Sequence, residues 1–339
     1  MDFNSFLMTV ITLFVLLIVG YVAGKRGIVD SVASKKFSSL IISIAQPALI
    51  IYSIISQPYY NESELAMAVR PIFSENFKLG LKTLLLGFGV HLFMALVAYL
   101  ACIRIKKLNE RKILEFAMVF GNTGFIGIPI LGALFPDKGA FQASFIVISF
   151  NILMWTLGML ILGRQRDDVK LTLKKALVNK GTIPSLIGIA VFLIPAIPAF
   201  SSFDLAANLP FATESLKYIS GLCTPVSMLI IGALISRVSL KKILTTVKLY
   251  YLCLFKLFVT PMLVCLIMKA GSLVFGYSSD WILFATALTS MPSATSVSML
   301  AELYDISPEF SAQGVGMTSL ISIATMPCVI LLTQLIISL

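Results

Sequence analysis

Two short polar segments lie inside apolar stretches of the chain, and their residue types could bind a small anion. The first is residues 121–130, Gly-Asn-Thr-Gly-Phe-Ile-Gly-Ile-Pro-Ile, and the second is residues 289–296, Thr-Ser-Met-Pro-Ser-Ala-Thr-Ser. Each segment contains a proline, which has no N–H for the helical ladder and whose ring clashes with the preceding turn. We therefore expect a membrane-spanning helix to be interrupted in both places, at Pro129 and Pro292.

An interrupted helix exposes N–H groups and a positive dipole end, and both favour an anion. Each helix N-terminus stabilises an anion by about 0.3–1 kcal/mol when exposed and by up to about 2 kcal/mol when partly buried. Two such ends and an amide could hold a carboxylate weakly enough for release. Alternatively, the polar side chains only satisfy backbone groups that the interruptions leave free. The candidate substrate-binding residues here are Asn122, Thr123, Gly124, Gly127, Pro129, Pro292, Ser293, Ala294 and Thr295.

Three ionisable residues in or near apolar stretches are candidates for charge balance or coupling. Lys256 is the only basic residue deep in a predicted span, where a charge is costly and usually paired or functional. It could attract an anion, but we favour a charge-balancing role, for example by pairing with Glu115 or Glu302. Glu115 could instead be interfacial or carry a proton. His91, the sole histidine, is expected to be a satisfied polar residue between helices.

Composition sets the class of protein. Apolar residues make up 58% of the chain and charged residues 12%, and the mean hydropathy is +0.97. A soluble protein carries about 25% charged residues. Apolar blocks of about 20 residues, the length that crosses a membrane as a helix, recur along the sequence. We predict an all-α integral membrane protein with ten spans, at 6–23, 37–56, 80–103, 113–134, 141–163, 182–200, 215–236, 248–270, 281–301 and 311–338.

Loop charge predicts the orientation. The loops after the first, third, fifth and seventh spans hold 19 of the 26 basic residues, so that side should be cytoplasmic and both termini outside. The net charge of +10 therefore reflects short loops at a membrane surface and not a nucleic-acid site. We expect no removable signal peptide, because the first apolar block starts acidic at Asp2 and is too long. The predicted location is the cytoplasmic membrane.

The chain divides near residue 170 into two halves of five predicted spans. Each half has a proline in its second span, Pro47 or Pro225, and an interruption in its fourth, at Pro129 or Pro292. Because five is odd, the second half must cross the membrane with opposite polarity. This pattern predicts two inverted five-helix repeats, with interrupted helices 4 and 9 forming the central site of a secondary transporter.

The sequence contains no pattern that would support catalysis. Phosphate-binding and dinucleotide-binding glycine loops, HExxH and CxxC are absent, and one histidine inside a span makes a hydrolytic triad untenable. The five cysteines all fall inside predicted spans, where they act as small packing residues. We therefore expect no enzyme activity, no cofactor and no metal site.

The motifs resemble those of the auxin efflux carrier family, which includes plant auxin exporters and bacterial malate or malonate permeases. The resemblance rests on Asn122-Thr123 followed by Gly127-Ile128-Pro129, on Pro292 followed by Ala301-Glu302-Leu303-Tyr304, and on Gly20-Tyr21, Lys25-Arg26-Gly27 and Pro47. It covers nearly the whole chain. The long cytoplasmic loop of the plant exporters is absent, so auxin is not implied as the substrate.

The resemblance implies a scaffold domain and a mobile transport domain. The scaffold would be residues 1–56 and 182–236, and the transport domain residues 80–163 and 248–339. Broken helices 4 and 9 would cross, as in bile acid symporters and NhaA-like proteins, and scaffold helices would form a homodimer. Asn151 resembles the amide that lines the family's cavity, and Thr224 and Ser227 would line the scaffold side. A basic residue before Pro261, here Lys256, is also typical of the family.

The functional prediction is a secondary transporter that moves small organic anions, mono- or dicarboxylates, by alternating access. The first alternative is a sodium-coupled organic anion symporter of the bile acid type, with Gln313, Ser290 and Glu302 as oxygen ligands. A channel or a non-transporting sensor is a further alternative. The predicted partners are the anion, the lipid bilayer and a second copy of the chain.

Overall fold

The computed structural model describes residues 3–55, 69–165, 182–194, 208–238 and 245–339, together with positions 197, 200 and 241. These residues form helices and connecting turns, and the only β-type pairing among them is an isolated bridge. Seven continuous helical stretches in the described part are long and apolar enough to cross a membrane. The prediction of an all-α, multi-pass membrane protein is therefore confirmed.

The helices follow the chain in this order: α1 (Phe3–Lys25), α2 (Ser31–Leu40), η1 (Ile41–Ala45), α3 (Gln46–Ile55), α4 (Val69–Cys102), α5 (Leu108–Val119), η2 (Thr123–Gly127), α6 (Ile128–Leu134), α7 (Gly139–Leu153), η3 (Met154–Gly158), α8 (Met159–Leu162), α10 (Thr182–Leu193), α12 (Pro210–Gly221), α13 (Cys223–Arg237), α15 (Val247–Leu254), η6 (Phe255–Val259), α16 (Thr260–Phe275), α17 (Ser279–Thr289), α18 (Thr295–Leu303) and α19 (Pro308–Ser338). The η elements are single π-helical turns that continue into a neighbouring α-helix, and η2 is the first turn of its helix. Residues 56–68 lie outside the described part of the chain, and the helix that follows them, α4, begins at Val69.

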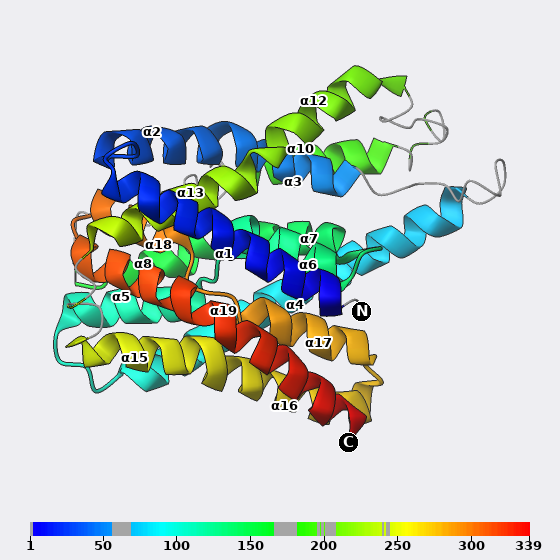
Figure 1. The fold of residues 1–339 in the computed structure, drawn as a ribbon. Coiled ribbons are helices and arrows are strands. Elements are labelled where there is room, and N and C mark those ends of the chain that lie inside the picture. The colour runs from blue at the N-terminus through cyan, green and yellow to red at the C-terminus, as the bar shows by residue number, and fades with distance from the viewer. Residues whose placement is uncertain are drawn as a thin grey trace.

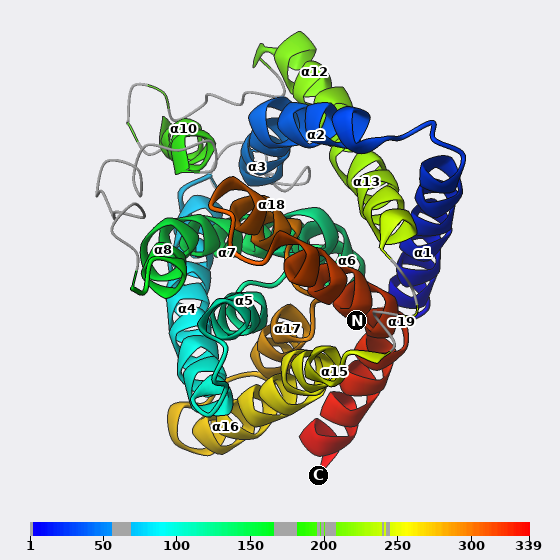
Figure 2. The ribbon, with the colours of Figure 1, turned by 90° about the vertical axis from the view of Figure 1, so that its left-hand side faces the viewer.

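The helices run roughly parallel and form one bundle, and both termini lie at the same end of it (Figure 1). Viewed along the bundle, α1, α2, α3, α12 and α13 lie along one side, while α4, α5, α15, α16 and α17 lie on the other (Figure 2). Helices α6, α7 and α18 lie between them, and α7 contacts both α3 and α4. The interior is filled by buried apolar side chains, and exposed Leu, Ile, Val and Phe cover the outside.

Glycines allow α1 and α13 to touch backbone to backbone. A Cβ atom on Gly232 of α13 would lie 2.1 Å from the carbonyl oxygen of Leu17 and 2.6 Å from the nitrogen of Tyr21. On α1, a Cβ atom on Gly20 would lie 2.3 Å from the carbonyl oxygen of Leu229. Small residues at such contacts are how membrane helices pack closely without a hydrophobic driving force. The pair α1–α13 is therefore tightly packed beside the central helices.

Three of the four π-helical turns named above end two residues before a proline, at Pro47, Pro129 and Pro261. A proline removes one N–H bond and its ring clashes with the carbonyl four residues earlier. A π turn shifts the bonds from the fourth to the fifth preceding residue, and this adjustment accommodates the ring inside a continuous helix. These prolines therefore stand inside helical stretches without ending them.

Candidate functional site at two interrupted helices

Two pairs of helices are separated by short non-helical segments at the centre of the bundle. Helix α5 ends at Val119 and η2 begins at Thr123. Helix α17 ends at Thr289 and α18 begins at Thr295. The two segments, residues 120–122 and 290–294, come from opposite halves of the sequence and contact each other directly.

Main-chain hydrogen bonds join the two non-helical segments. The N–H of Asn122 donates to the carbonyl of Pro292 at 2.7 Å, and the N–H of Ala294 donates to the carbonyl of Phe120 at 2.9 Å. These bonds satisfy buried backbone groups that the helix ends leave free, which membrane proteins require away from water. The two interruptions therefore form one joint.

Ser293 adds side-chain bonds to the same joint. It pairs with Gly121 in an isolated antiparallel bridge. Its hydroxyl donates to the carbonyl of Ala117 at 2.9 Å, and its N–H donates to the hydroxyl of Thr318 on α19 at 3.2 Å. Ser293, just before α18, is thus bonded to both α5 and α19. This is the alternative to ligand binding named above, in which the polar side chains satisfy free backbone groups.

The first interruption lies earlier than expected. The sequence places it at Pro129, but the non-helical residues are 120–122, and Pro129 stands in the first turn of α6. The cause is Asn122, whose side-chain oxygen accepts from the N–H of Phe125 at 3.3 Å and starts a new helix there. The π turn η2 then accommodates Pro129. The second interruption does contain its proline, Pro292.

Two predicted site residues have buried amides with unused donors. Asn122 and Asn151 are each 3% exposed. The Nδ2 atom of each finds no hydrogen-bond partner among the described residues. Helix α7, which carries Asn151, packs against η2, and its Phe150 contacts Phe120 edge-on at 5.5 Å between ring centroids. Leaving a buried donor unpaired costs about 1–3 kcal/mol, so an acceptor group placed beside either amide would be stabilised there.

A cavity of about 520 Å³ lies beside the joint, between α2 and α13 on one side and η2 and α18 on the other. It brings together the predicted residues Ser227 and Thr295. Thr295 is the first residue of α18, so the positive end of that helix borders the cavity. The lining contains two basic residues and no acidic one: Ser31, Ser34, Lys35, Ser38, Ile41, Phe125, Ser227, Ile230, Leu234, Arg237, Thr295, Ser298 and Met299.

Several cavity residues were not predicted as site residues. Lys35 and Arg237 entered the sequence argument only as loop charges, although each lies within about one helical turn of a predicted span end. Arg237 donates to the carbonyl of Val29 and to the hydroxyl of Ser34, both at 2.7 Å, which holds its guanidinium at the cavity. The serines of α2, spaced three to four residues apart, were the signal that could have identified this face.

The remaining predicted residues of the first segment pack close to the joint. The Thr123 hydroxyl donates weakly to the carbonyl of Gly121 at 3.4 Å. A Cβ atom on Gly124 would lie 3.1 Å from the Gln46 amide nitrogen, and one on Gly127 would lie 2.8 Å from the Met291 sulfur. The side chain of Gln46 therefore lies beside the start of η2. The sequence analysis singled out only the residue that follows it, Pro47. Thr224 is not among the residues that line the cavity.

Lys256 lies fully buried behind the joint, in the π turn η6. Its Nζ atom lies 3.9 Å from the sulfur of Met94 and forms no ion pair with a described acidic side chain. His91, on the same helix as Met94, contacts the carbonyl of Gly87 through Nδ1 at 2.7 Å. Its Nε2 has no partner in the described residues, so His91 is only half satisfied.

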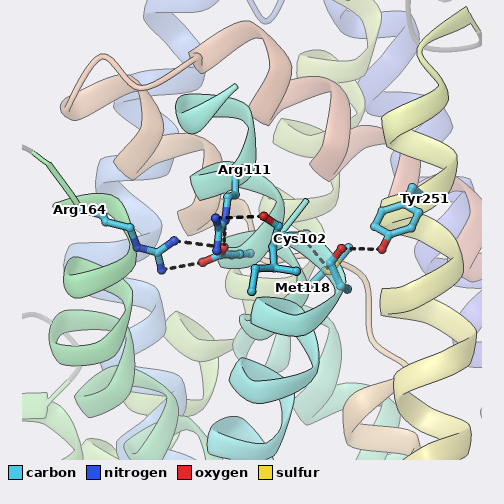
Figure 3. A network of polar contacts seen from close by, with 8 residues as sticks. Cys102, Arg111, Met118, Arg164 and Tyr251 are labelled. Carbon is cyan, nitrogen blue, oxygen red and sulfur yellow. Dashed lines mark hydrogen bonds and ion pairs between the residues drawn. The ribbon is translucent and has the colours of Figure 1, made fainter. Parts of the chain in front are cut away.

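Glu115 pairs with two arginines and not with Lys256 (Figure 3). Arg111, one turn earlier on α5, donates to it at 2.6 Å, and Arg164, after α8, donates through two nitrogens at 3.1 and 2.8 Å. The carboxylate is 2% exposed. This network fastens α5, which leads into the joint, to the end of α8. The Glu302 side chain lies outside the described residues.

Replacing Glu115 with glutamine is expected to lower the unfolding free energy by about 1–3 kcal/mol, because one buried partner of a pair would be removed while both arginines stay partly exposed. Thermal unfolding of the detergent-solubilised protein measures this. Glu214→Gln is the matched control, since Glu214 pairs with Lys217 on an exposed surface and should matter little. Equal stability of the two variants would contradict a structural role for the Glu115 network.

A second charged cluster joins the starts of α5 and α15 at the end of the bundle away from the termini. Glu110 pairs with Lys107 at 3.2 Å and with Lys248. Partial burial acts to raise the pKa of Glu110, but the hydrogen bonds from Lys248 and Lys107 outweigh it and lower that pKa. Gln313, expected as a sodium ligand, donates here to Glu309 at 3.3 Å. Ser290, the other described candidate ligand, donates to the carbonyl of Ala287.

A multi-pass helical bundle with a polar joint of two interrupted helices beside a cavity is the architecture of a membrane transporter. A family model described as "Membrane transport protein" matches residues 5–330. The chain belongs to this family, which is that of the auxin efflux carriers, and the resemblance seen in the sequence is confirmed.

Related proteins support the same class. The chain is 25% identical over 324 residues to an uncharacterized transporter of Methanocaldococcus jannaschii, a match that covers 93% of this chain and 94% of that protein. It is 22% identical over 322 residues to an uncharacterized transporter of Methanothermobacter thermautotrophicus, covering 94% and 95%. It is 23% identical over 211 residues to a protein of Rhizobium meliloti named "Putative malonate transporter", covering 62% and 63%. The family and these relatives are transporters and not enzymes.

Proposed function

We propose that this protein is a secondary transporter that carries small organic anions across the cytoplasmic membrane. The observation that carries the proposal is the cavity beside the joint, which has Lys35 and Arg237, the N-terminus of α18 and several hydroxyls in its lining, and no carboxylate. Such a lining attracts a negatively charged ligand and repels a cation. Asn122 and Asn151 do not line this cavity, but they lie at and beside the joint that borders it, and their unused amide donors would favour a ligand rich in acceptor oxygens, such as a carboxylate.

The proposed mechanism is alternating access between two groups of helices. The scaffold would contain α1, α2, α3, α10, α12 and α13, and the transport domain the helices from α4 to α8 and from α15 to α19. In support, α1 packs closely on α13 and α3 on α10 and α12, while the joint connects the two halves of the other group. The two interrupted helices, each in the fourth span of its half, suggest inverted repeats related across the joint.

The cavity lies at the end of the bundle opposite the termini, since Ser31 follows α1 and Arg237 ends α13. The described loops after the first and third predicted spans, which are predicted to be cytoplasmic, lie at this end. The arrangement therefore fits an inward-facing state, in which an anion enters from the cytoplasm and reaches the start of α18. In the opposite state, the transport domain would present the same joint to the outside.

The experiment that tests the proposal is anion flux into proteoliposomes that contain the purified protein. Malonate, malate, succinate, acetate and lactate form the panel, with choline as a cation control, and each is measured with and without proton and sodium gradients. We expect saturable flux of at least one carboxylate and none of choline. Flux that fails to saturate would indicate a channel, and binding without flux would indicate a sensor.

Removing the cavity charge at Lys35 is expected to raise KM for the transported anion by about 3- to 10-fold, with a smaller effect at high salt, because an exposed charge acts through screened attraction. Flux measured with Lys35→Gln at low and high ionic strength checks this. Lys36→Gln is the matched control. It removes the same charge from the same helix, but Lys36 does not line the cavity. A similar rise in KM for both variants would mean that only overall charge matters.

The sodium-coupled alternative predicts a different result in the same assay. Flux would depend on the sodium gradient, and sodium would raise the unfolding temperature of the protein. Among the described residues, no group of three or more His, Cys, Asp or Glu side chains could hold a metal ion. A sodium site built from the described residues alone would use carbonyls and hydroxyls, such as those of the joint.

A further inference from the structure

The lining of the cavity beside the joint changes from charged at its mouth to apolar at its inner end. On α2, Lys35 lies near the mouth, and Ile41 follows six residues later. On α13, Arg237 lies at the mouth, and Ile230 lies seven residues before it. At about 1.5 Å of helix rise per residue, the two isoleucines lie about 9–10 Å deeper than the two basic residues.

The aromatic ring of Phe125 completes this apolar inner end. Phe125 is 9% exposed and lines the cavity. It belongs to an apolar cluster with Ile41 of η1 and with Cys223 and Ile230 of α13. Its N–H donates to the side chain of Asn122, so the ring is carried by the first turn of the helix that begins at the joint. Phe125 therefore forms the floor of the cavity where η2 meets α13.

The start of α18 supplies the polar part of the same end. Thr295, the first residue of α18, lines the cavity together with Ser227. The hydroxyl of Ser227 already donates to the carbonyl of Cys223 at 2.5 Å. The N–H groups and the positive dipole end of α18 therefore offer the main attraction for a carboxylate there. An acid with its carboxylate at this helix start would place the rest of its molecule among the apolar side chains around Phe125.

A second carboxylate on the same small acid would be poorly placed. Beside Phe125 and the two isoleucines it would lose its hydration against apolar groups, which is far more costly for a charged group than for a methyl group. The guanidinium of Arg237 is held at the mouth by the carbonyl of Val29 and the hydroxyl of Ser34. A chain of five carbons spans at most about 6 Å at about 1.5 Å per bond, which is shorter than the depth of the cavity.

We propose that Phe125 is a specificity-determining residue, which selects acids with one carboxylate and a short apolar chain and limits the length of that chain. The inference rests on the proposed function and narrows its substrate class. Lys35 and Arg237 then attract the acid to the mouth without binding a second carboxylate. The ring of Phe125 contacts the apolar end of the acid.

Acids of equal carbon number test the substrate class on the wild-type protein. The pairs are propionate and malonate, butyrate and succinate, and pentanoate and glutarate, at about pH 8, where their carboxyl groups are ionised. Affinity is measured as the concentration dependence of the rise in unfolding temperature of the solubilised protein. From acetate onward, each added CH₂ group should raise affinity about 4-fold until the chain meets the ring. Each monoacid should bind at least about 10-fold more tightly than its diacid.

Removing the ring tests the role of Phe125 itself. In Phe125→Ala the preferred chain should become longer, and hexanoate should gain about 10-fold in affinity relative to propionate, because two or more further CH₂ groups find room. Phe125→Leu should lie between the two. Phe284→Ala is the matched control: Phe284 is 2% exposed and contacts the rings of Phe135 and Trp281, but it does not line the cavity. It should lower stability without changing the order of the acids.

The outcomes separate the inference from the proposed function. Saturable flux of diacids, with malonate or succinate binding more tightly than its monoacid partner, would overturn the inference and leave anion transport intact. An unchanged order of chain lengths in Phe125→Ala would also overturn it. If that variant does not fold, Phe125→Leu and the wild-type pairs decide. Monoacid binding without flux would support the role of Phe125 and contradict transport, and the absence of binding by every acid would contradict both.

Discussion

Asn122→Asp is expected to reduce anion affinity on the order of 100-fold while the protein stays folded. The aspartate keeps the oxygen that accepts from the N–H of Phe125, so the start of η2 is preserved. It replaces the unused Nδ2 donor with a negative charge beside the proposed anion position. Loss of one hydrogen bond to a charged group costs about 1.5–3 kcal/mol, and repulsion adds to this. Binding is measured by anion-induced stabilisation and by flux.

Asn109→Asp is the control for this change. It makes the same amide-to-carboxylate replacement at an exposed position in the first turn of α5, where a negative charge is favourable. Affinity should be unchanged there. Asn122→Ala completes the series, because it removes the helix cap as well as the donor and should cost about 0.5–2 kcal/mol of stability in addition. Normal transport by a well-folded Asn122→Asp variant would remove Asn122 from the site.

Gly232→Ala is expected to lower the unfolding free energy by about 3 kcal/mol or more, an unusually large effect for one added methyl group. The new Cβ atom would lie within 2.6 Å of backbone atoms of both Leu17 and Tyr21, and neither can move without displacing α1. Thermal unfolding in detergent and the yield of monodisperse protein are the measurements. Because α1 and α13 form the wall of the proposed scaffold, transport should fall together with stability.

Gly89→Ala is the matched control, with an effect of opposite sign. Gly89 also lies inside a membrane helix, α4, but a Cβ atom there would meet nothing within 4 Å. Alanine has a higher helix propensity than glycine by up to about 1 kcal/mol, so this variant should be as stable as the wild type or more stable. If both variants behave alike, close backbone contact does not hold α1 against α13.

The helical membrane class could be predicted because it depends on composition and on the length of apolar blocks, both of which are local properties. The polar segments around Asn122 and Pro292 were recognisable for a similar reason, since polar residues inside a span need a local explanation. That they meet was expected from the resemblance to the family, in which broken helices 4 and 9 cross. The residues alone do not predict the contact, because a main-chain bond between residues 122 and 292 leaves no side-chain signal. The inverted repeat, the two domains and the homodimer stay predictions.

The predictions that were wrong or incomplete concern features that depend on a neighbouring side chain or helix. Pro129 drew attention as a helix breaker, yet the side chain of Asn122 decides where the new helix starts, and a π turn absorbs the proline. Glu115 was expected to pair with Lys256, but it pairs with Arg111 on its own helix and with Arg164 after α8. The cavity residues Lys35 and Arg237 were noted only as loop charges, because their position facing η2 and α18 depends on how α2 and α13 pack.

The joint between residues 120–122 and 292–294 is held largely by peptide groups, which every residue type except proline supplies in full. A substitution in these segments can therefore change what the surrounding surface recognises while the two halves of the protein stay connected. The contact between the two segments and the side chains that surround it can thus change independently of each other. Under the proposed function, related chains could therefore differ in substrate through a few side chains while the main-chain contact between the two segments stays the same.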